Sequence, residues 1–302
     1  MKLEVNNLSK FYGDFQALNN VSFSIESGKI LGLLGRNGAG KTTTIKSIMG
    51  IIEPEKGEIL FDQKPLNREK IHIGYLPEER GLYLNMSVKD QLFYFGMLNG
   101  LDKKTAHKET QNCLEEFGIK KYMDKKVKEL SKGNKQKIQL ISAILHRPQI
   151  VILDEPFSGL DPVNVELFKQ VVYRLKEEGT TILFSSHRME DVEEMCDSIV
   201  MLKNGTVIEN NTVGGLIEKY SKKNTVMLRV NQDIKPLLLH NNHKLSLQTE
   251  NGFCYEIKYQ KREDLSEFYL QLLENHIDLI EIGEPKCSLQ SIFVKELSED
   301  GK

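Results

Sequence analysis

A glycine-rich segment with a lysine and two threonines, GRNGAGKTT, follows the apolar run Ile30 to Leu34. Glycines let the backbone curl so that its N–H groups point at phosphate oxygens, and the N-terminus of a following helix adds partial positive charge. In such a loop Lys41 would reach the β- and γ-phosphates of a nucleotide, and the Thr42 hydroxyl would hold Mg²⁺. Because the apolar run predicts a buried strand and TTTIKSIM predicts a helix, we favour a phosphate-binding loop over a chance glycine turn.

Polar residues end two further apolar runs. Asp154 and Glu155 follow Ile150 to Leu153, and His187 follows shortly after Ile182 to Phe184. A carboxylate at the carboxyl end of a parallel strand beside a phosphate loop can bind Mg²⁺, which suits Asp154. Glu155 would then lie where a base could activate water attacking a γ-phosphate. Taken singly, Glu155 could be a surface acid and His187 a structural histidine. Three polar residues at one edge of the sheet, beside a phosphate loop, favour a functional site over these structural roles.

The fold expected from these elements is α/β. Short apolar runs bounded by polar loops are typical of parallel strands that are buried on both faces. Period-two segments near the N-terminus, Lys2 to Val5, Val21 to Ile25 and Gly57 to Phe61, predict β-strands. A region rich in lysine and glutamate, Val88 to Leu145, predicts helices.

A change of pattern near Tyr220 predicts a second domain. The polar stretch KYSKKNT indicates a linker. Beyond it we expect a strand (Val226 to Val230), a weak helix (Ile234 to Leu239), a hairpin turning at Asn251-Gly252, a helix (Glu263 to Leu273) and a strand (Leu279 to Ile282). This βαββαβ order suits a small ferredoxin-like sandwich. The expected domains are therefore residues 1–218 and a C-terminal α+β domain, residues 219–302.

Five motifs in this order resemble the ATP-binding subunit of an ATP-binding cassette (ABC) transporter over about residues 1 to 215. LSKGNKQ, residues 130–136, resembles the family's LSGGQ signature, and SGLD, residues 158–161, resembles its D-loop. His187 stands at the position of the switch histidine. Tyr12 stands where the family stacks an aromatic ring on adenine, although core packing is the plainer role for a tyrosine. The resemblance implies a P-loop NTPase with a mixed core sheet, an antiparallel β subdomain and a helical subdomain.

The resemblance also implies a set of site residues. Glu155 and His187 would be catalytic, and Mg²⁺ would be held by Thr42, Asp154 and Glu78. ATP would be bound by Tyr12, Gly35, Arg36, Asn37, Gly38, Ala39, Gly40, Lys41, Thr42, Thr43, Ser131, Gly133 and Asp161. Three positions depart from the family's pattern: Lys132 replaces a signature glycine, Asn134 replaces the signature glutamine, and Glu78 replaces a glutamine. The first two lie outside the Ser-x-Gly contact with phosphate, while Glu78 adds a charge near Mg²⁺.

A lysine-rich stretch surrounds the signature, with eight lysines from Lys120 to Lys137. This stretch could bind a nucleic acid, form a solvated face or contribute to a nucleotide site. Only Tyr122 supplies an aromatic ring, and the whole chain has a net charge of −2, so we expect no nucleic-acid partner. By resemblance, the signature opens a helix whose N-terminus faces the γ-phosphate of ATP on a second subunit.

The expected function is an ATPase that drives transport. We favour export, because the sequence looks similar to a subgroup of ABC transporters likened to sodium or drug exporters. Two copies would bind two MgATP between them and act on separate membrane permease subunits.

No apolar run reaches the roughly 18 residues that span a bilayer, and no signal peptide is evident, so we expect a peripheral protein on the cytoplasmic face. Four scattered cysteines predict buried free thiols. The alternatives are a soluble ABC ATPase acting on ribosomes or DNA and a small-molecule kinase, which would leave the signature unexplained.

Overall fold

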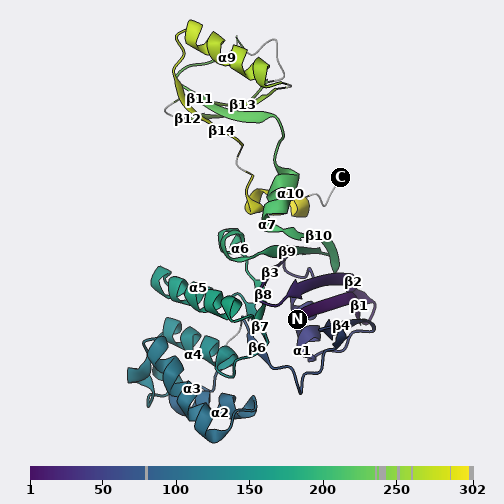
Figure 1. Cartoon of the computed structure of the whole chain (residues 1–302), viewed down its shortest axis with the longest axis vertical. Coiled ribbons are helices and arrows are strands. Elements are labelled where there is room, and N and C mark those ends of the chain that lie inside the picture. The colour runs from purple at the N-terminus through teal and green to yellow at the C-terminus, as the bar shows by residue number, and fades with distance from the viewer. Residues whose placement is uncertain are drawn as a thin grey trace. The chain divides into compact units, whose positions relative to one another are not determined.

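A computed structural model describes residues 1–78, 81–234, 237, 243–249, 252–259, 261–285 and 287–298 (Figure 1). Within it Met1–Val213, with the segment that starts at Leu297, forms one compact unit, and Gly214–Glu296 forms a second. This division falls a few residues before the boundary expected from the polar linker, because helix α7 (Val213–Tyr220) belongs with the second unit. Each unit has its own apolar core.

A six-stranded mixed sheet is the centre of the first unit. Its strand order is β10-β9-β3-β8-β7-β6, and all neighbouring pairs are parallel except β10 and β9. Every residue of β3, β7 and β8 is buried, which explains why their sequences are continuous apolar runs. The bounds are β3 Ile30–Leu34, β6 Ile73–Leu76, β7 Ile150–Asp154, β8 Thr181–Ser185, β9 Ser198–Lys203 and β10 Thr206–Thr212.

A second, antiparallel sheet has the order β2-β1-β4-β5. Alternate residues of its strands, such as Leu3, Val5, Phe23 and Ile25, are buried, as the period-two pattern predicts. These side chains join those of β3, β7 and β8 in one core cluster. The bounds are β1 Lys2–Tyr12, β2 Phe15–Glu26, β4 Lys56–Phe61 and β5 Lys64–Pro65.

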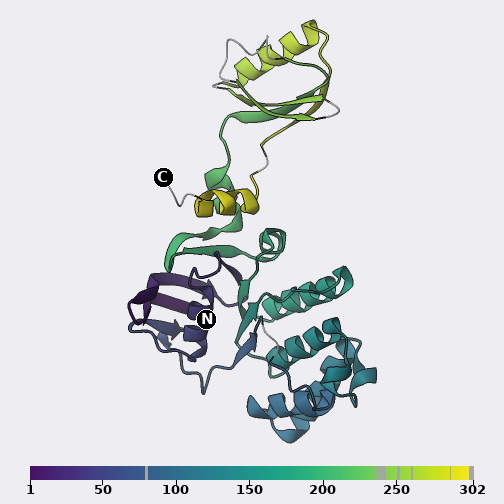
Figure 2. The same ribbon diagram turned by 180° about the vertical axis from the view of Figure 1, so that it is seen from behind.

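Helices make up the remaining part of the first unit. Figure 2 shows α2, α3 and α4 on one side of the parallel strands and the antiparallel sheet on the other. Ile138, Ile141 and Ile144 of α4 are buried and, at a spacing of three residues, form a stripe along one side of the helix. The bounds are α1 Lys41–Met49, α2 Val88–Leu98, α3 Lys103–Glu116, α4 Lys132–Ile144, α5 Pro162–Glu177 and α6 Met189–Met195, with two 3₁₀ turns at Lys120–Tyr122 and Val127–Glu129. The predicted fold class, including its helical and antiparallel parts, is confirmed.

The second unit contains a four-stranded antiparallel sheet of order β12-β13-β11-β14. Helix α9 (Arg262–Glu274) buries Phe268 and Leu272 in this unit's core. Most of the helix expected over Ile234 to Leu239, and Asn251 of the expected turn, lie outside the described residues. The ferredoxin-like arrangement therefore stays a prediction. The strands are β11 Thr225–Val230, β12 His243–Thr249, β13 Gly252–Lys258 and β14 Leu279–Gly283.

Helix α10 (Leu289–Ser298) has no counterpart in the sequence-based prediction. It contacts α7, where Tyr220 Oη donates a 2.7 Å hydrogen bond to Glu296 Oε1 and its ring lies 5.2 Å from Lys295 Nζ. All four cysteines are free; Cys113 and Cys196 are buried, but Cys254 and Cys287 are only half-buried. Across the described ranges, no helix combines the length and apolar character that crossing a membrane requires.

Candidate nucleotide site

Four neighbouring parallel strands deliver the candidate residues to one edge of the central sheet. Strands β3, β8, β7 and β6 lie side by side, and their carboxyl ends lead to the glycine-rich loop, His187, Asp154 with Glu155, and Glu78, respectively. Parallel strands place their carboxyl ends at the same edge, which is the usual position of ligand sites in α/β sheets. The sheet therefore gathers residues separated by up to half the chain.

The glycine-rich loop depends on glycine at position 40. Gly40 has φ 108°, a left-handed conformation, and a Cβ there would lie 2.7 Å from Leu18 Cδ2. Gly40 also caps helix α1, and its carbonyl accepts the first intrahelical bond, from Thr44 N at 2.9 Å. Two other loop glycines, Gly35 and Gly38, have positive φ as well. The backbone thus curls directly into the helix N-terminus, which favours anions.

Lys41 lies at the first position of α1 and points back over the loop. Its Nζ donates hydrogen bonds to the carbonyls of Gly35, at 2.6 Å, and Arg36, at 3.3 Å. Burial lowers the pKa of Lys41, and the charges of Glu155, Asp154 and Glu78 oppose this fall. A desolvated ammonium beside these carboxylates can exchange its carbonyl partners for phosphate oxygens.

Asp154 ends β7 inside the protein, and its carboxylate accepts a hydrogen bond from the hydroxyl of Ser185 on β8. Burial, together with the negative charges of Asp154 and Glu78, raises the pKa of the neighbouring Tyr75 to about 12. Thr42, Asp154 and Glu78 line the same cavity and offer hard oxygen donors, which suit Mg²⁺. Within the described ranges no three acidic, histidine or cysteine side chains form a ready-made metal cluster.

Glu155 adopts an unusual backbone conformation. Its φ of 50° is left-handed, which costs of order 1–3 kcal/mol for a residue other than glycine. Its N–H donates to the Ser185 carbonyl at 3.1 Å, and its own carbonyl accepts from Ser158 N at 3.1 Å. These bonds hold the kink that ends β7. Such strain is typical of functional positions and turns the carboxylate toward the cavity.

The Glu155 carboxylate is nearly buried, with an 11% exposed side chain. Its Oε1 accepts no hydrogen bond from any described residue and lies 3.5 Å from His187 Nε2. Burial raises the pKa of Glu155, and the charge of His187 opposes the rise. A carboxylate with raised pKa and a free lone pair can accept a proton from water.

Tyr12 lies at the end of β1 with a ring that is 49% exposed, so core packing does not account for it. Phe15, which is 63% exposed, follows across the turn between β1 and β2. Both aromatic side chains line the same cavity as the glycine-rich loop. A flat base could stack on such a ring.

The cavity has a volume of about 370 Å³. Among the candidate residues it is lined by Tyr12, residues 36–38 and 40–43, Glu78, Asp154, Glu155 and His187. Gly35 and Ala39 belong to the loop but do not line it. Ser131, Gly133 and Asp161 are also absent from its lining. The structure thus brings most of the candidate residues together in one cavity and leaves the signature and SGLD residues outside it.

Those three outlying residues lie at two adjacent helix N-termini. Ser131 caps α4, accepting a 3.3 Å hydrogen bond from Asn134 N. Asp161 caps α5, with Oδ1 accepting from Asn164 N at 3.0 Å. A Cβ on Gly133 would lie 3.2 Å from Asn164 Nδ2, so the two helix starts are in contact. The lysine that replaces a signature glycine, Lys132, extends over Gly159 of the SGLD segment.

The lysine-rich stretch around the signature is otherwise a solvated face. Lys120 pairs with Glu115, and Lys121 and Lys125 lie over the Tyr122 ring at 5.2 and 5.3 Å. These local contacts agree with the solvated-face interpretation.

Sequence reasoning missed Ser185, Phe15 and Asn164. Ser185 and Phe15 adjoin residues that were singled out, His187 and Tyr12. Asn164 follows Asp161 at the spacing of a helix cap, in the segment DPVN, where a proline at the first helical position also signals a helix start. That local signal was sufficient to find the second helix N-terminus.

Comparison with known proteins places this geometry in a family. The family model described as "ABC transporter" matches residues 18–158. The chain is 43% identical to an uncharacterized ABC transporter ATP-binding protein of Bacillus subtilis (YhaQ), over 98% of both chains. It is 30% identical to the bacitracin transport ATP-binding protein BcrA of Bacillus licheniformis, over 97% of this chain and 96% of that protein. Among solved structures, one titled "Structure of ATP binding subunit of ABC transporter" has a TM-score of 0.68 and 33% identity, covering 73% of this chain and 93% of that one. The chain therefore belongs to the family of ABC transporter ATP-binding subunits, which are ATP-hydrolysing proteins.

Proposed function

We propose that this ATPase energises transport, in the export direction, through separate membrane permease subunits, and that two copies of it share two MgATP. The observation that carries the proposal is the division of the candidate site. Lys41, Asp154, Glu155 and His187 line one cavity, while Ser131 and Gly133 lie outside it at a helix N-terminus of the same chain. A second copy would supply the missing half.

The residues of the cavity would act in distinct ways on ATP. Loop amides and Lys41 bind the phosphates, and Tyr12 stacks on the adenine. Glu155 accepts a proton from the attacking water, because its carboxylate is poorly solvated and its pKa is raised by burial. His187, 3.5 Å from that carboxylate, orients it and the terminal phosphate.

Mg²⁺ would be held by Thr42 and Asp154, with Glu78 close by, and when bound it would neutralise phosphate charge. Glu78 brings a full negative charge where the family's pattern has an amide. Lys41 faces Glu78, Asp154 and Glu155 together, so the site has more acid than base before the substrate arrives. This composition supports a requirement for a divalent cation with the nucleotide.

Ser131 and Gly133 of one copy would contact the γ-phosphate held by the other. The Ser131 hydroxyl accepts from Asn134 N and keeps its own proton for a phosphate oxygen. The first amides of α4 and the helix dipole add donors and positive potential. Asp161, which caps α5 beside this helix start, would be placed at the same interface. Closing the two copies over ATP would drive the permease, since the closed pair lasts only while the γ-phosphate bridges it.

The trans arrangement is tested by mixing two inactive variants, Lys41→Ala and Ser131→Arg. In a mixed dimer one site carries both lesions and the other carries none. We expect partial recovery of ATPase activity on mixing. A signature that acts on its own chain's ATP predicts no recovery.

A second readout covers the case in which both sites must fire together. Adding Glu155→Gln to both variants should allow ATP-driven mixed dimers, detected by size-exclusion chromatography with differently tagged chains. The absence of both recovery and mixed dimers would refute the composite site.

A role in transport, and with it a membrane partner, is supported by a relative named for bacitracin transport that spans nearly the whole chain. The competing function is an ABC ATPase that acts on ribosomes or DNA. Fractionation of cells separates the two: the chain should sediment with membranes in a manner that depends on its permease. Salt-resistant association with ribosomes and none with membranes would favour the competing function.

A further inference from the structure

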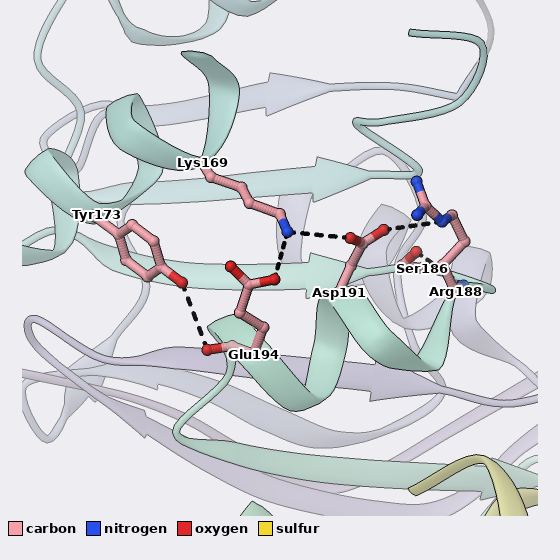
Figure 3. Close-up of polar contacts among 6 residues, drawn as sticks. All are labelled: Lys169, Tyr173, Ser186, Arg188, Asp191 and Glu194. Atoms are coloured by element: carbon pink, nitrogen blue, oxygen red, sulfur yellow. Dashed lines mark hydrogen bonds and ion pairs between the residues drawn. The ribbon is translucent and has the colours of Figure 1, made fainter. Parts of the chain in front are cut away.

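Asp191 is a buried carboxylate that does not line the nucleotide cavity. Its side chain is only 3% exposed and lies in the first turn of the short helix α6, close after His187 (Figure 3). One oxygen, Oδ1, lies 3.4 Å from Lys169 Nζ, and the other, Oδ2, lies 3.3 Å from Arg188 Nε. A buried carboxylate is costly unless it is paired, so these two cations offset the cost of burying Asp191.

Lys169 reaches Asp191 from a different helix, α5. Its side chain is 11% exposed, and it also bonds Glu194 at the end of α6. Burial alone would lower the pKa of Lys169, but the hydrogen bond and charge of Glu194 and the charge of Asp191 outweigh it and raise the pKa. Tyr173 of α5 adds a 3.4 Å hydrogen bond to the Glu194 carbonyl. Helix α6 is thus fixed to α5 at both ends (Figure 3).

His187 lies between these anchored parts. Before it, β8 is buried and Ser186 Oγ accepts a 3.1 Å hydrogen bond from Arg188 N. After it, Arg188 pairs with Asp191 through its side chain. Helix α6 has no side-chain cap of its own, so the Asp191 contacts are the polar anchors of its first turn. The backbone of His187 is held from both sides, although its ring is 51% exposed.

We propose that Asp191 and Lys169 are positioning residues for His187. The pair holds the first turn of α6 against α5 and thereby keeps the His187 ring 3.5 Å from the Glu155 carboxylate. Because Asp161 caps α5, the same ion pair also connects the SGLD segment to His187 within one chain. This inference rests on the proposed role of His187 in ATP hydrolysis.

A double-mutant cycle on the full chain tests the proposal. Asp191→Asn removes the charge but keeps the shape, and His187→Ala removes the positioned ring. Misplacement of a catalytic group by about 1 Å can cost on the order of 100-fold. We expect Asp191→Asn to lower kcat by about 10- to 100-fold, with little change in KM for ATP. In the His187→Ala background, Asp191→Asn should cause no further loss, because residues that act as a unit are not additive.

Two further variants separate positioning from folding. Lys169→Met with Asp191→Leu replaces the buried pair by apolar groups, a change that often preserves stability. This double variant should keep its melting temperature and yet lose kcat. Lys169→Arg, which keeps the charge, should retain most of the activity.

Lys176→Met is the matched control. Lys176 lies about two turns further along α5 and pairs with Asp197 at 2.9 Å, away from His187. The Lys176→Met substitution should lower thermal stability and leave kcat unchanged. Equal losses from Asp191→Asn with and without His187, or wild-type kcat in the apolar double variant, would overturn the positioning role. Wild-type activity in His187→Ala alone would instead refute the proposed role of His187 itself.

Discussion

Glu155 Oε1 and His187 Nε2 lie 3.5 Å apart, at the ends of the neighbouring parallel strands β7 and β8. The two residues are 32 positions apart in the chain, and neither contact atom has a closer described ion-pair partner. The kink at Glu155 and the anchored first turn of α6 set this separation. The geometry of the site therefore depends on the left-handed backbone of Glu155 and on the ion pairs that hold the first turn of α6.

Lys41→Ala and Glu155→Gln should fail in different ways. Lys41 neutralises phosphate charge, so its loss should weaken both ATP binding and hydrolysis. Glu155→Gln keeps the shape of the site and removes the base, so ATP should bind and remain intact, with hydrolysis lowered by about 100-fold or more. Nucleotide retention and phosphate release measure the two effects. Lys46→Ala, an exposed lysine on the same helix α1, is the control and should behave as wild type. Hydrolysis at the wild-type rate in Glu155→Gln would show that Glu155 is not the base.

The acid limb of the pH–rate profile should reflect the raised pKa of Glu155. A general base works only when ionised, so activity should fall as pH decreases through this pKa, above the ordinary glutamate value of about 4.3. In His187→Gln the acid limb of the residual activity should lie at still higher pH. The charge of His187 opposes the rise in the pKa of Glu155, and this substitution removes it. The measurement is kcat/KM for ATP against pH, with nucleotide affinity followed in parallel. A limb at or below the ordinary glutamate value would contradict the assignment.

His146 should make the protein sensitive to acid. This histidine is 6% exposed, and burial, aided by nearby His72, lowers its pKa to about 4. The unfolded chain binds the proton below an ordinary pKa of about 6.5, whereas the folded chain does not until about pH 4. The contribution to stability is complete above pH 6.5 and is lost as pH falls toward 4, by about 3 kcal/mol in total.

Denaturant unfolding between pH 7 and pH 4 measures this dependence. His146→Leu should flatten the slope of the free energy of unfolding against pH in that range. His107→Gln, which alters an exposed histidine stacked on Phe93, should leave the slope unchanged. An equal slope in His146→Leu and wild type would assign the acid sensitivity to other groups.

Gly159→Ala should impair the SGLD segment through Lys132. Gly159 has φ 70°, and a Cβ there would collide with the Lys132 side chain. Gly118→Ala is the control, since Gly118 has φ 66° and open space around a Cβ. Both variants should lose about 1–2 kcal/mol of the free energy of unfolding, the cost of a left-handed L-residue. Only Gly159→Ala should also lower ATPase activity, by several-fold. Equal activities in the two variants would show that the Lys132 contact is dispensable.

The C-terminal unit should be separable from the ATPase. The first unit comprises Met1–Val213 and the segment that starts at Leu297, and its core cluster takes side chains from β1, β2, β3, β7 and β8, all of which precede Val213. A chain that ends at Val213 should fold and bind ATP, as measured by circular dichroism and nucleotide titration. A chain that ends at Tyr220 keeps α7 but loses α10, and with it the hydrogen bond that Tyr220 donates to Glu296. Failure of the shorter chain to fold would mean that later residues complete the first core.

The sequence by itself determined the local parts of this protein. Strands β3, β7 and β8 were identified within one residue at each end, because a strand buried on both faces needs an unbroken apolar run. The glycine-rich loop follows from local backbone chemistry, which a few adjacent residues fix. Resemblance supplied the signature and SGLD segments, and their residues lie at helix N-termini.

The tertiary structure decided what depends on residues far apart in the chain. Strand order places Glu155 beside His187, and no local pattern encodes that pairing. The left-handed φ of Glu155 goes against the preference of its residue type and is held by a hydrogen bond to Ser185. Likewise Lys169 and Asp191 each look like ordinary charged helix residues, and only the packing of α5 against α6 buries them as a pair. A buried charge gains its stability from a partner that the fold must bring to it, so its role could not be determined from its own neighbours in the sequence.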